Sequence, residues 1–295
     1  METINRNQNT NHCIELLAAQ RIIYRYAKKN RTIRIVGSFG LTIIAPVTIL
    51  LLPDFKIALG IVGGIWTIIA FLLSTRETNK VKEAATIQEE FDTNTFELDW
   101  NNIQCGTKVS NEIIHSSASK YKDKTDLNNW YGDLDGISNN LAILICQRSN
   151  LVWDWRLRKQ FAWTIIICLL ILFGVGIGIA LYQKLTLETY LISILLPSAS
   201  AFILGIKEIK EHFDSAKSKE TLEKKINSIW EKSLTSLIAP TKLELRQVQD
   251  KIFHLRTNTA LIPDWWYNKL KGDFEESMQN TIDRYRNEAR NKNIT

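Results

Sequence analysis

The fold is decided by IVGSFGLTIIAPVTILLLP at residues 35–53 and IALGIVGGIWTIIAFLLST at residues 57–75, two stretches without Asp, Glu, Lys or Arg. A helix of about 20 apolar residues covers the roughly 30 Å hydrocarbon core of a bilayer. Each stretch has about this length, and only three residues separate them. They therefore predict a transmembrane helical hairpin over residues 35–75.

The same pattern returns in residues 160–183 and 189–206, which are joined by residues 184–188. All 37 Lys and Arg and all 31 Asp and Glu lie outside the four uncharged stretches. This segregation is typical of membrane proteins, and it excludes a plain soluble enzyme and a secreted disulfide-rich module. The alternation over about ten residues that marks a membrane barrel is absent. We predict an all-α membrane protein with four transmembrane helices in two hairpins and a cytoplasmic helical bundle.

The distribution of Lys and Arg predicts the orientation, because cytoplasmic flanks are enriched in them. Residues 1–34 contain seven, whereas each hairpin turn contains one, Lys56 or Lys184. The turns are therefore expected outside and both termini in the cytoplasm. The expected parts are a cytoplasmic amphipathic basic helix over 1–34, transmembrane hairpins over 35–75 and 160–206, and cytoplasmic helical regions over 76–159 and 207–295.

Apolar residues at helical spacing predict that the cytoplasmic parts are also helical. Residues 13–29 form an amphipathic basic pattern. One continuous helix is expected from about residue 139 into the third span, and another from the fourth span until Pro240 stops it. Further helices are predicted around residues 245–255 and over 264–290. Their apolar stripes must pack against other helices, so a cytoplasmic bundle follows.

The sequence lacks the patterns of an enzyme or a metal site. Its four histidines are not paired at metal-ligand spacing, no HExxH, GxSxG or P-loop motif occurs, and its four cysteines form no CxxC. The net charge of +6 is explained by cations next to the membrane. We expect no enzymatic activity, no cofactor, no metal and no binding of a nucleic-acid polymer.

The densest unusual chemistry lies in ICQRSNLVWDWRLRKQFAW at residues 145–163. Guanidinium groups bind phosphate through paired hydrogen bonds, and indole rings stack on bases. The candidate ligand-binding residues are Arg148, Asn150, Trp153, Arg156 and Arg158. Two other interpretations stay open: the tryptophans and cations near the membrane form an interfacial belt and topology anchors, and Arg148 forms a structural salt bridge.

A pore would need a wettable face, and the fourth span offers one. Thr189, Ser193, Pro197 and Ser200 follow at steps of four, four and three residues, which aligns them on one side of a helix. One chain filled with Leu and Ile cannot enclose water, so conduction would require a homo-oligomer in the lipid bilayer. The alternative is that these hydroxyls bond to the backbone around a kink at Pro197.

Two pairs of glycines in the spans have the small-xxx-small spacing that lets helices approach closely, Gly60 with Gly64 and Gly174 with Gly178. This spacing is common by chance in apolar helices. It is a weak indication of helix contacts and no indication of catalysis.

Several segments together resemble a known family: LLAAQRIIYRYAKK (16–29), IQEEFDTNTFELDWN (87–101), NNWYGDLDG (128–136), ICQRSNLVWDWRLRKQF (145–161) and LRTNTALIPDWWY (255–267). In this order, and with two hairpins, the chain resembles the SMODS-associated four-transmembrane (S-4TM) pore-forming effectors over nearly its whole length. The resemblance implies a bacterial inner-membrane effector of antiviral defence, encoded beside an enzyme that makes cyclic nucleotides. It also implies that this second messenger, a cyclic oligonucleotide, triggers membrane disruption and death or dormancy of the infected cell.

Together these observations lead to the hypothesis of a non-enzymatic, oligomeric membrane effector. Its cytoplasmic helices would sense the signal, and its hairpins would permeabilise the membrane. The alternative is a membrane scaffold or sensor that recruits a soluble partner through its C-terminal helical bundle and leaves the membrane tight.

Overall fold

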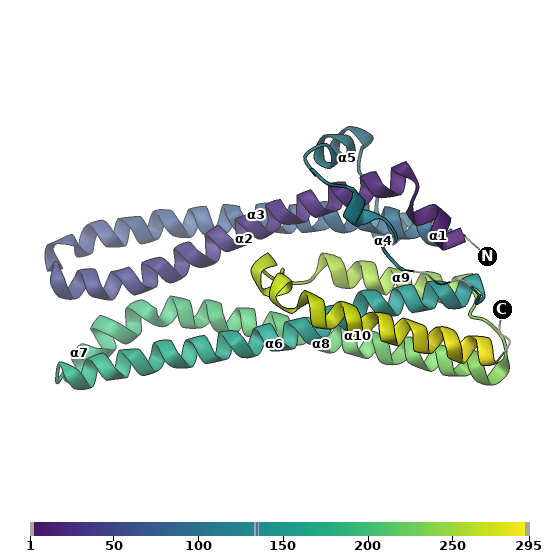
Figure 1. The fold of residues 1–295 in the computed structure, drawn as a ribbon. Coiled ribbons are helices and arrows are strands. Elements are labelled where there is room, and N and C mark those ends of the chain that lie inside the picture. The colour runs from purple at the N-terminus through teal and green to yellow at the C-terminus, as the bar shows by residue number, and fades with distance from the viewer. Residues whose placement is uncertain (1–2, 133, 135, 293–295) are drawn as a thin grey trace.

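A computed structural model describes residues 3–132, 134 and 136–292 (Figure 1). Side chains are outside the described set for Ala45, Pro46, 49–51, Pro53, Lys56, Trp153, Ser193, Pro197, Ser200 and 271–279. All regular structure in the described residues is helical, which confirms the all-α prediction. In chain order the elements are α1 (Thr3–Gln8), α2 (Asn11–Leu51), η1 (Pro53–Phe55), α3 (Lys56–Phe96), α4 (Asn102–Cys105), α5 (Asn111–Ala118), η2 (Thr125–Leu127), α6 (Asn139–Tyr182), α7 (Leu187–Tyr190), η3 (Leu191–Leu195), α8 (Leu196–Ser236), α9 (Lys242–Thr257) and α10 (Asp264–Asn291).

Four long helices form the frame of the molecule. α2, α3 and α8 have 41 residues each, and α6 has 44. The predicted continuous helices are present, because α6 begins at Asn139 and α8 ends at Ser236, shortly before Pro240. α3 and α8 each end on a residue with left-handed backbone, Glu97 with a φ of 53° and Leu237 with a φ of 58°. Such a residue turns the chain away from the helix axis.

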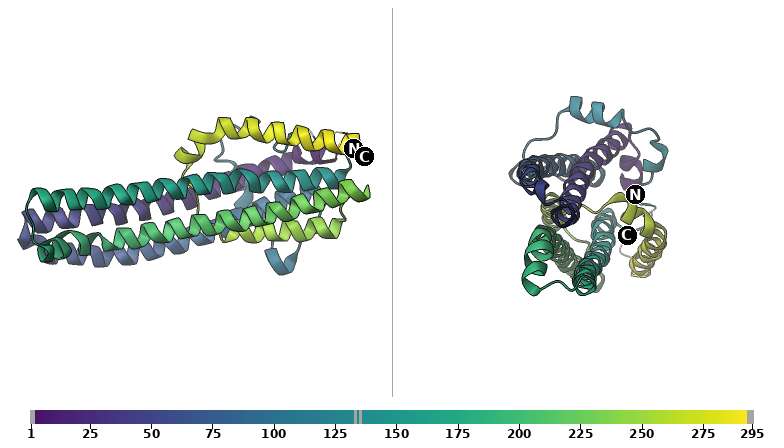
Figure 2. Two further views of the ribbon diagram at one scale, coloured as in Figure 1. Left: turned by 90° about the horizontal axis from the view of Figure 1, so that it is seen from below. Right: turned by 90° about the vertical axis from the view of Figure 1, so that its left-hand side faces the viewer.

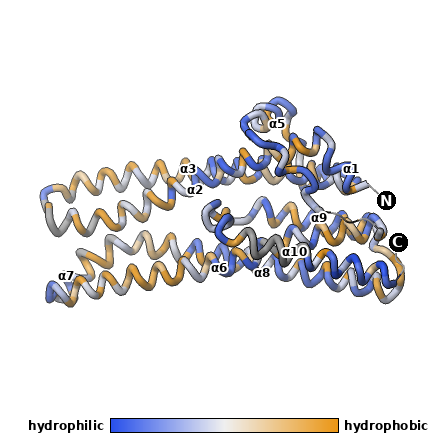
Figure 3. Tube along the Cα trace, in the orientation of Figure 1, coloured by the Kyte–Doolittle hydropathy of each residue, from blue (hydrophilic) through white to orange (hydrophobic). Residues whose placement is uncertain are grey.

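The long helices pair into two antiparallel hairpins, α2 with α3 and α6 with α8 (Figures 1 and 2). Hydrophobic residues are concentrated where these helices approach the hairpin tips (Figure 3). We call this part the apolar half (residues 35–75 and 160–206). The rest of the described chain is the polar body, in which the shorter helices surround the other ends of the long ones (Figure 1).

Two described helical segments are long and apolar enough to cross a membrane, Ile57–Phe96 and Asn139–Tyr182. Only 0% and 6% of their apolar windows are buried. Apolar side chains exposed on this scale need an apolar solvent or a partner to cover them. The other two expected spans include side chains outside the described set. The structure therefore supports a membrane protein with two candidate spans, while the four-span topology stays a prediction.

The polar body has a hydrophobic core of its own. Leu17 of α2, Phe91 of α3 and Leu144 of α6 are among its fully buried side chains. α9 packs against α3, α6 and α8, and its first turn is fixed by a capping box between Thr241 and Glu244. The core thus joins both hairpins to one helical body.

Close helix contacts in the apolar half occur at other glycines than predicted. A Cβ atom on Gly37 would lie 2.0 Å from the ring of Trp66, and one on Gly205 would lie 2.8 Å from Leu169. These glycines let α2 approach α3 and α8 approach α6. A Cβ atom on any glycine of the two predicted pairs would meet nothing within 4 Å. Among the described residues, those pairs mediate no close contact within one chain, so that interpretation was wrong at the level of the protomer.

Candidate functional site

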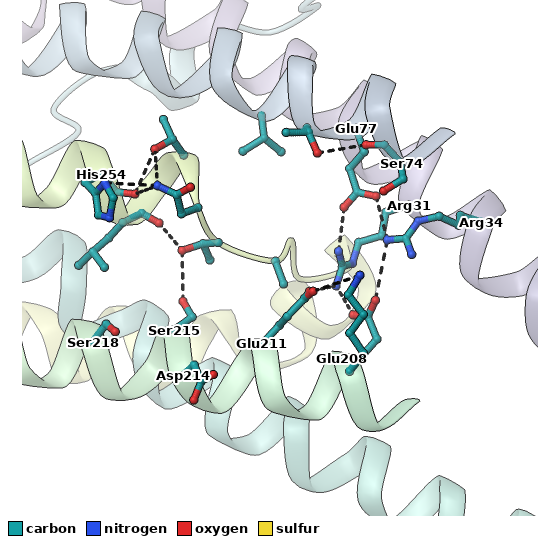
Figure 4. Close-up of a pocket in the computed structure, with 18 of the residues that line it drawn as sticks. Arg31, Arg34, Ser74, Glu77, Glu208, Glu211, Asp214, Ser215, Ser218 and His254 are labelled. Carbon is teal, nitrogen blue, oxygen red and sulfur yellow. Dashed lines mark hydrogen bonds and ion pairs between the residues drawn. The ribbon is translucent and has the colours of Figure 1, made fainter. Parts of the chain in front are cut away.

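Charged side chains join the two hairpins at the base of the apolar half (Figure 4). Arg31 of α2 donates hydrogen bonds to Glu77 of α3, at 2.7 Å, and to Glu208 of α8. Arg34 donates a 3.0 Å hydrogen bond to Glu77 and lies 3.8 Å from Glu208. We call these four residues the junction cluster. It ion-pairs one hairpin to the other.

Three of the four members of the junction cluster are buried although all four are charged. The side chains of Arg31, Glu77 and Glu208 are 6%, 9% and 6% exposed. Burial lowers the pKa of Arg31, but the carboxylates of Glu208 and Glu77 outweigh this effect and raise it above its ordinary value. Burial raises the pKa of Glu208, Arg31 opposes this shift, and nearby Glu211 adds to it. Removing one partner would leave a buried charge unpaired, which is costly.

A cavity of about 560 Å³ adjoins the junction cluster (Figure 4). Its walls come from α2, α3, α8, α9 and the connection between α9 and α10. The junction cluster contributes all four of its side chains to the lining, and Lys251 of α9 contributes a further cation. The volume falls in the range of small-molecule sites, roughly 300–1,000 Å³. We call this space the junction cavity.

A second group of buried polar side chains lies behind the junction cluster. Nε2 of His212 is 3.9 Å from Glu208, and its Nδ1 is 3.4 Å from Arg158. Asp154 accepts hydrogen bonds from Arg158, at 2.8 Å, and from Lys219. Burial, and after it the nearby arginines, lowers the pKa of His212 to about 2, so its imidazole is neutral. Burial, and after it Arg256, lowers the pKa of Lys219 to about 7. Burial, and after it Arg31, lowers the pKa of Arg158 to about 9.

Arg148, the central residue of the predicted ligand site, is part of a polar network. It donates hydrogen bonds to Glu223, at 2.7 Å, and to Asn227, at 2.8 Å. Its guanidinium also lies 4.8 Å from the ring centre of Tyr285, and Trp155 donates a 2.7 Å hydrogen bond to the same glutamate. The salt bridge that the sequence left open as an alternative is present. A ligand role for Arg148 stays a prediction.

The other predicted ligand residues point to different surroundings. Asn150 donates a 3.0 Å hydrogen bond to the hydroxyl of Tyr131, Arg156 is exposed, and Arg158 is buried. The side chain of Trp153 lies outside the described residues. The described members of this set therefore have different neighbours. In the described chain, no three His, Cys, Asp or Glu side chains are grouped to hold a metal ion.

The predicted pore face is described at one position. Thr189 shares a 2.9 Å hydrogen bond between hydroxyls with Thr186 at the start of α7. The helix continues through one π-helical turn, Leu191–Leu195, into α8. Next to Pro197, the hydroxyl of Ser198 donates to the carbonyl of Ile194 at 2.7 Å, which is the kind of backbone bond expected around a proline. The side chains of Ser193, Pro197 and Ser200 lie outside the described residues.

The junction cluster was not found from the sequence. In the sequence, Arg31 and Arg34 belong to the cations that indicate topology, and Glu77 and Glu208 belong to no motif. A signal was nevertheless there, because Glu77 and Glu208 each stand two residues after an uncharged stretch, while Arg34 stands directly before another. Helix ends that meet at one membrane surface bring such charges to the same level.

Comparisons with known proteins identify the family. Residues 2–285 match the SMODS-associating 4TM effector domain. The chain is 31% identical over 281 residues to the probable CBASS effector molecule of Bacillus cereus (strain VD146), with 90% of this chain and 93% of that protein covered. No solved structure matches. The resemblance drawn from the sequence is thereby confirmed: the chain belongs to the SMODS-associating 4TM effector domain family.

Proposed function

We propose that the protein is a membrane effector of antiviral defence that permeabilises the membrane after its polar body senses a nucleotide second messenger. Family membership and the probable CBASS effector from Bacillus cereus support the defence role. The exposed apolar windows of α3 and α6 support a place in the membrane. In this proposal it is a multi-pass protein of the bacterial inner membrane, with both termini in the cytoplasm.

The continuity of the four long helices carries this proposal. Each of α2, α3, α6 and α8 runs without a break from the polar body into the apolar half (Figures 1 and 3). A shift of a helix in the body is therefore transmitted along a stiff rod to the hairpin tips. A ligand can drive such a shift only if it binds the permeabilising arrangement better than the resting one.

A homo-oligomer is the proposed permeabilising form. A single chain offers two helical hairpins, and its apolar half presents Leu, Ile, Val and Phe side chains to the outside. Such a surface can line no water path, so several copies must place polar faces around an axis. The proposed pore-lining face carries Thr189, Ser193, Pro197 and Ser200. The protein acts without enzymatic chemistry or a cofactor in this proposal.

The test is expression in a bacterial host with and without a nucleotide cyclase, while a potential-sensitive dye reports the membrane potential. We expect loss of potential and growth arrest only when both proteins are produced. A polarised, growing culture under both conditions would contradict the permeabilising function.

Arg148→Ala tests whether the sequence-predicted segment takes part in sensing. We expect signal-dependent toxicity to disappear while the amount of membrane-inserted protein is unchanged. Arg284→Ala is the matched control, because Arg284 also lies against the ring of Tyr285, at 5.7 Å, but its side chain is 70% exposed. Equal toxicity of both variants would remove Arg148 from the sensing machinery.

A membrane scaffold is the second candidate function. It is favoured by three exposed apolar side chains around the turn from α8 to α9, Leu237, Ile238 and Leu243. Such a group at the end of the polar body suits recruitment of a soluble protein. This function predicts a tight membrane under the conditions above, so the same dye measurement separates the two candidates.

A further inference from the structure

We propose that the junction cavity binds a small ligand through a phosphate group, and that this phosphate takes Arg31 and Arg34 away from Glu77 and Glu208. The exchange would dissolve the ion pairs between the two hairpins. The biological consequence rests on the proposed function, but binding at this site can be measured independently of it.

One cation of the lining is free to meet an anion. Its four carboxylates are already neutralised: the junction cluster pairs two of them, Glu211 lies 3.8 Å from Lys207, and Asp214 receives a 2.6 Å hydrogen bond from Lys210, which is outside the lining. Lys251, in contrast, has no ion pair with a described residue, although it lines the cavity. The lining has as many cations as carboxylates, four of each, so its formal charge is zero, and Lys251 supplies the one cation that no described carboxylate holds.

The lining also offers hydrogen-bond donors. Ser74 of α3 and Ser218 of α8 contribute hydroxyl groups. The side chains of five further lining residues already form hydrogen bonds within the protein: Thr78, Ser215, Thr257, Asn258 and Thr259. The Nε atom of Arg34 is buried and has no hydrogen-bond partner. Phosphate oxygens accept hydrogen bonds from guanidinium, ammonium and hydroxyl groups, and arginine binds phosphate in a bidentate manner. The donors present thus match a phosphate group.

The position of the arginines couples binding to the hairpins. Arg31 and Arg34 line the cavity and hold Glu77 and Glu208 at the same time. A phosphate carries up to two negative charges and competes for both guanidinium groups. When it succeeds, α2 loses its ion pairs to α3 and α8 at the base of the apolar half. The apolar ends of the two hairpins then lose this ionic link, while the core of the polar body still joins the hairpins.

Two kinds of ligand can bring a phosphate group to the junction cavity. The cavity lies in the polar body directly beside the apolar half, so a soluble phosphate compound and the headgroup of an anionic lipid can both approach it. The predicted recognition is the same in either case. The two sources are separated by the probes used in the experiment.

The experiment is calorimetric titration of the full-length chain in neutral detergent micelles. The probes are sodium tripolyphosphate, the dinucleotide cyclic di-AMP, and phosphatidylglycerol added in mixed micelles, with phosphatidylcholine as the reference lipid. Binding of a soluble probe supports a soluble ligand, and binding of phosphatidylglycerol alone supports a lipid headgroup. Absence of binding by all three probes overturns the proposal.

Exposed lining residues provide variants that leave the fold intact. Lys251→Gln and Ser218→Glu should each weaken binding about tenfold, the effect of losing one charge-assisted contact. Lys225→Gln and Thr221→Glu make the same chemical changes at exposed positions outside the lining and should leave affinity within about twofold. Equal affinity of cavity and control variants would place the bound probe elsewhere and overturn the site.

Glu77→Gln tests the exchange of partners. If phosphate and Glu77 compete for the arginines, neutralising the glutamate should tighten binding about tenfold, because one charge-assisted competitor is lost. A residue with a purely structural role would weaken binding or leave it unchanged when replaced, and either outcome contradicts the exchange.

Dye release from liposomes separates this inference from the proposed function. Phosphate binding without release refutes permeabilisation and leaves the site intact. Release that occurs normally in Lys251→Gln, under conditions where that variant binds no probe, refutes the site and leaves permeabilisation intact.

Discussion

The junction cluster and a second buried group, which we call the body cluster (Glu89, Asp92, Arg246 and Arg256), use the same chemistry to join different parts of the molecule. In the body cluster, Arg256 of α9 donates a 2.6 Å hydrogen bond to Asp92 of α3, and Arg246 binds Glu89. Both carboxylates are fully buried. Gln249 donates to both of them, at 2.8 and 2.9 Å. The body cluster therefore holds a helix to the core.

The surroundings of the two clusters differ. Asp92 is further satisfied by the hydroxyl of Tyr131 and is closed off by protein. The junction cluster borders a cavity of about 560 Å³ and joins the two hairpins. A cluster enclosed by protein stabilises one arrangement, whereas a paired cluster beside a cavity can change partners. We infer that the body cluster maintains the fold and that the junction cluster controls the hairpins.

Breaking the body cluster should have the largest effect on stability. Arg256→Ala leaves Asp92 buried without its ion-pair partner, and we expect a loss of about 3–5 kcal/mol in the free energy of unfolding. Denaturant unfolding of the protein in detergent, followed by tryptophan fluorescence, measures this change. Arg284→Ala breaks an exposed pair with Glu288 and should cost less than about 1 kcal/mol. Similar losses in both variants would show that the body cluster is not dry.

Breaking the junction cluster should cost less stability and change function more. Arg31→Ala leaves Glu77 and Glu208 without their main partner, but water from the cavity can solvate them, so we expect about 2 kcal/mol rather than the cost of a dry pair. We also expect dye release from liposomes without any signal. Lys210→Ala breaks an exposed pair with Asp214 and is the control. A tight membrane with Arg31→Ala would contradict the control of the hairpins by this cluster.

If the two hairpins move relative to each other, the two helices within each hairpin must stay packed together. A substitution at Gly37 tests this packing in the first hairpin. Gly37→Leu places a side chain where the ring of Trp66 lies, 2.0 Å from the new Cβ atom, and we expect a loss of about 1–3 kcal/mol. Gly64→Leu is the matched control in α3, because its Cβ atom meets nothing within 4 Å. Thermal unfolding in detergent measures both. Equal midpoints would mean that packing at Gly37 does not hold the first hairpin together.

The long helices could be predicted from the sequence because their signals are local. Uncharged stretches and helical periods are read along the chain, and α6 and α8 begin and end close to the positions that these patterns indicate. Pairing of charges between distant helices has no such local signal. The ion pair between Arg31 and Glu208 joins residues 177 positions apart, and only the packing of α2 against α8 brings them together.

The segment 145–163 differs, because its residue types indicate phosphate binding while the structure shows that its described side chains have different neighbours. A helix turns successive residues by about 100°, so Arg148, Asn150 and Arg158 face different neighbours in a crowded bundle. Two of them have carboxylate partners, Glu223 and Asp154. Composition identifies groups that can bind phosphate, but it does not tell which are already occupied by a glutamate or an aspartate.

The smallest predicted effect is a change of stability with pH. It tests whether water reaches His212 of α8, which lies beside Glu208 of the junction cluster. His212, beside Glu208, has a pKa lowered to about 2 in the folded protein, whereas the unfolded chain takes up a proton near pH 6.5. Its contribution to stability is therefore complete above about pH 6.5 and decreases below that value, by about 1 kcal/mol at pH 5.5. The measurement is the difference in unfolding free energy between the natural protein and His212→Gln at pH 7.5 and 5.5, since groups common to both proteins largely cancel. If this difference does not change with pH, the imidazole is hydrated or charged in the folded state, and the junction cluster is open to water on both sides.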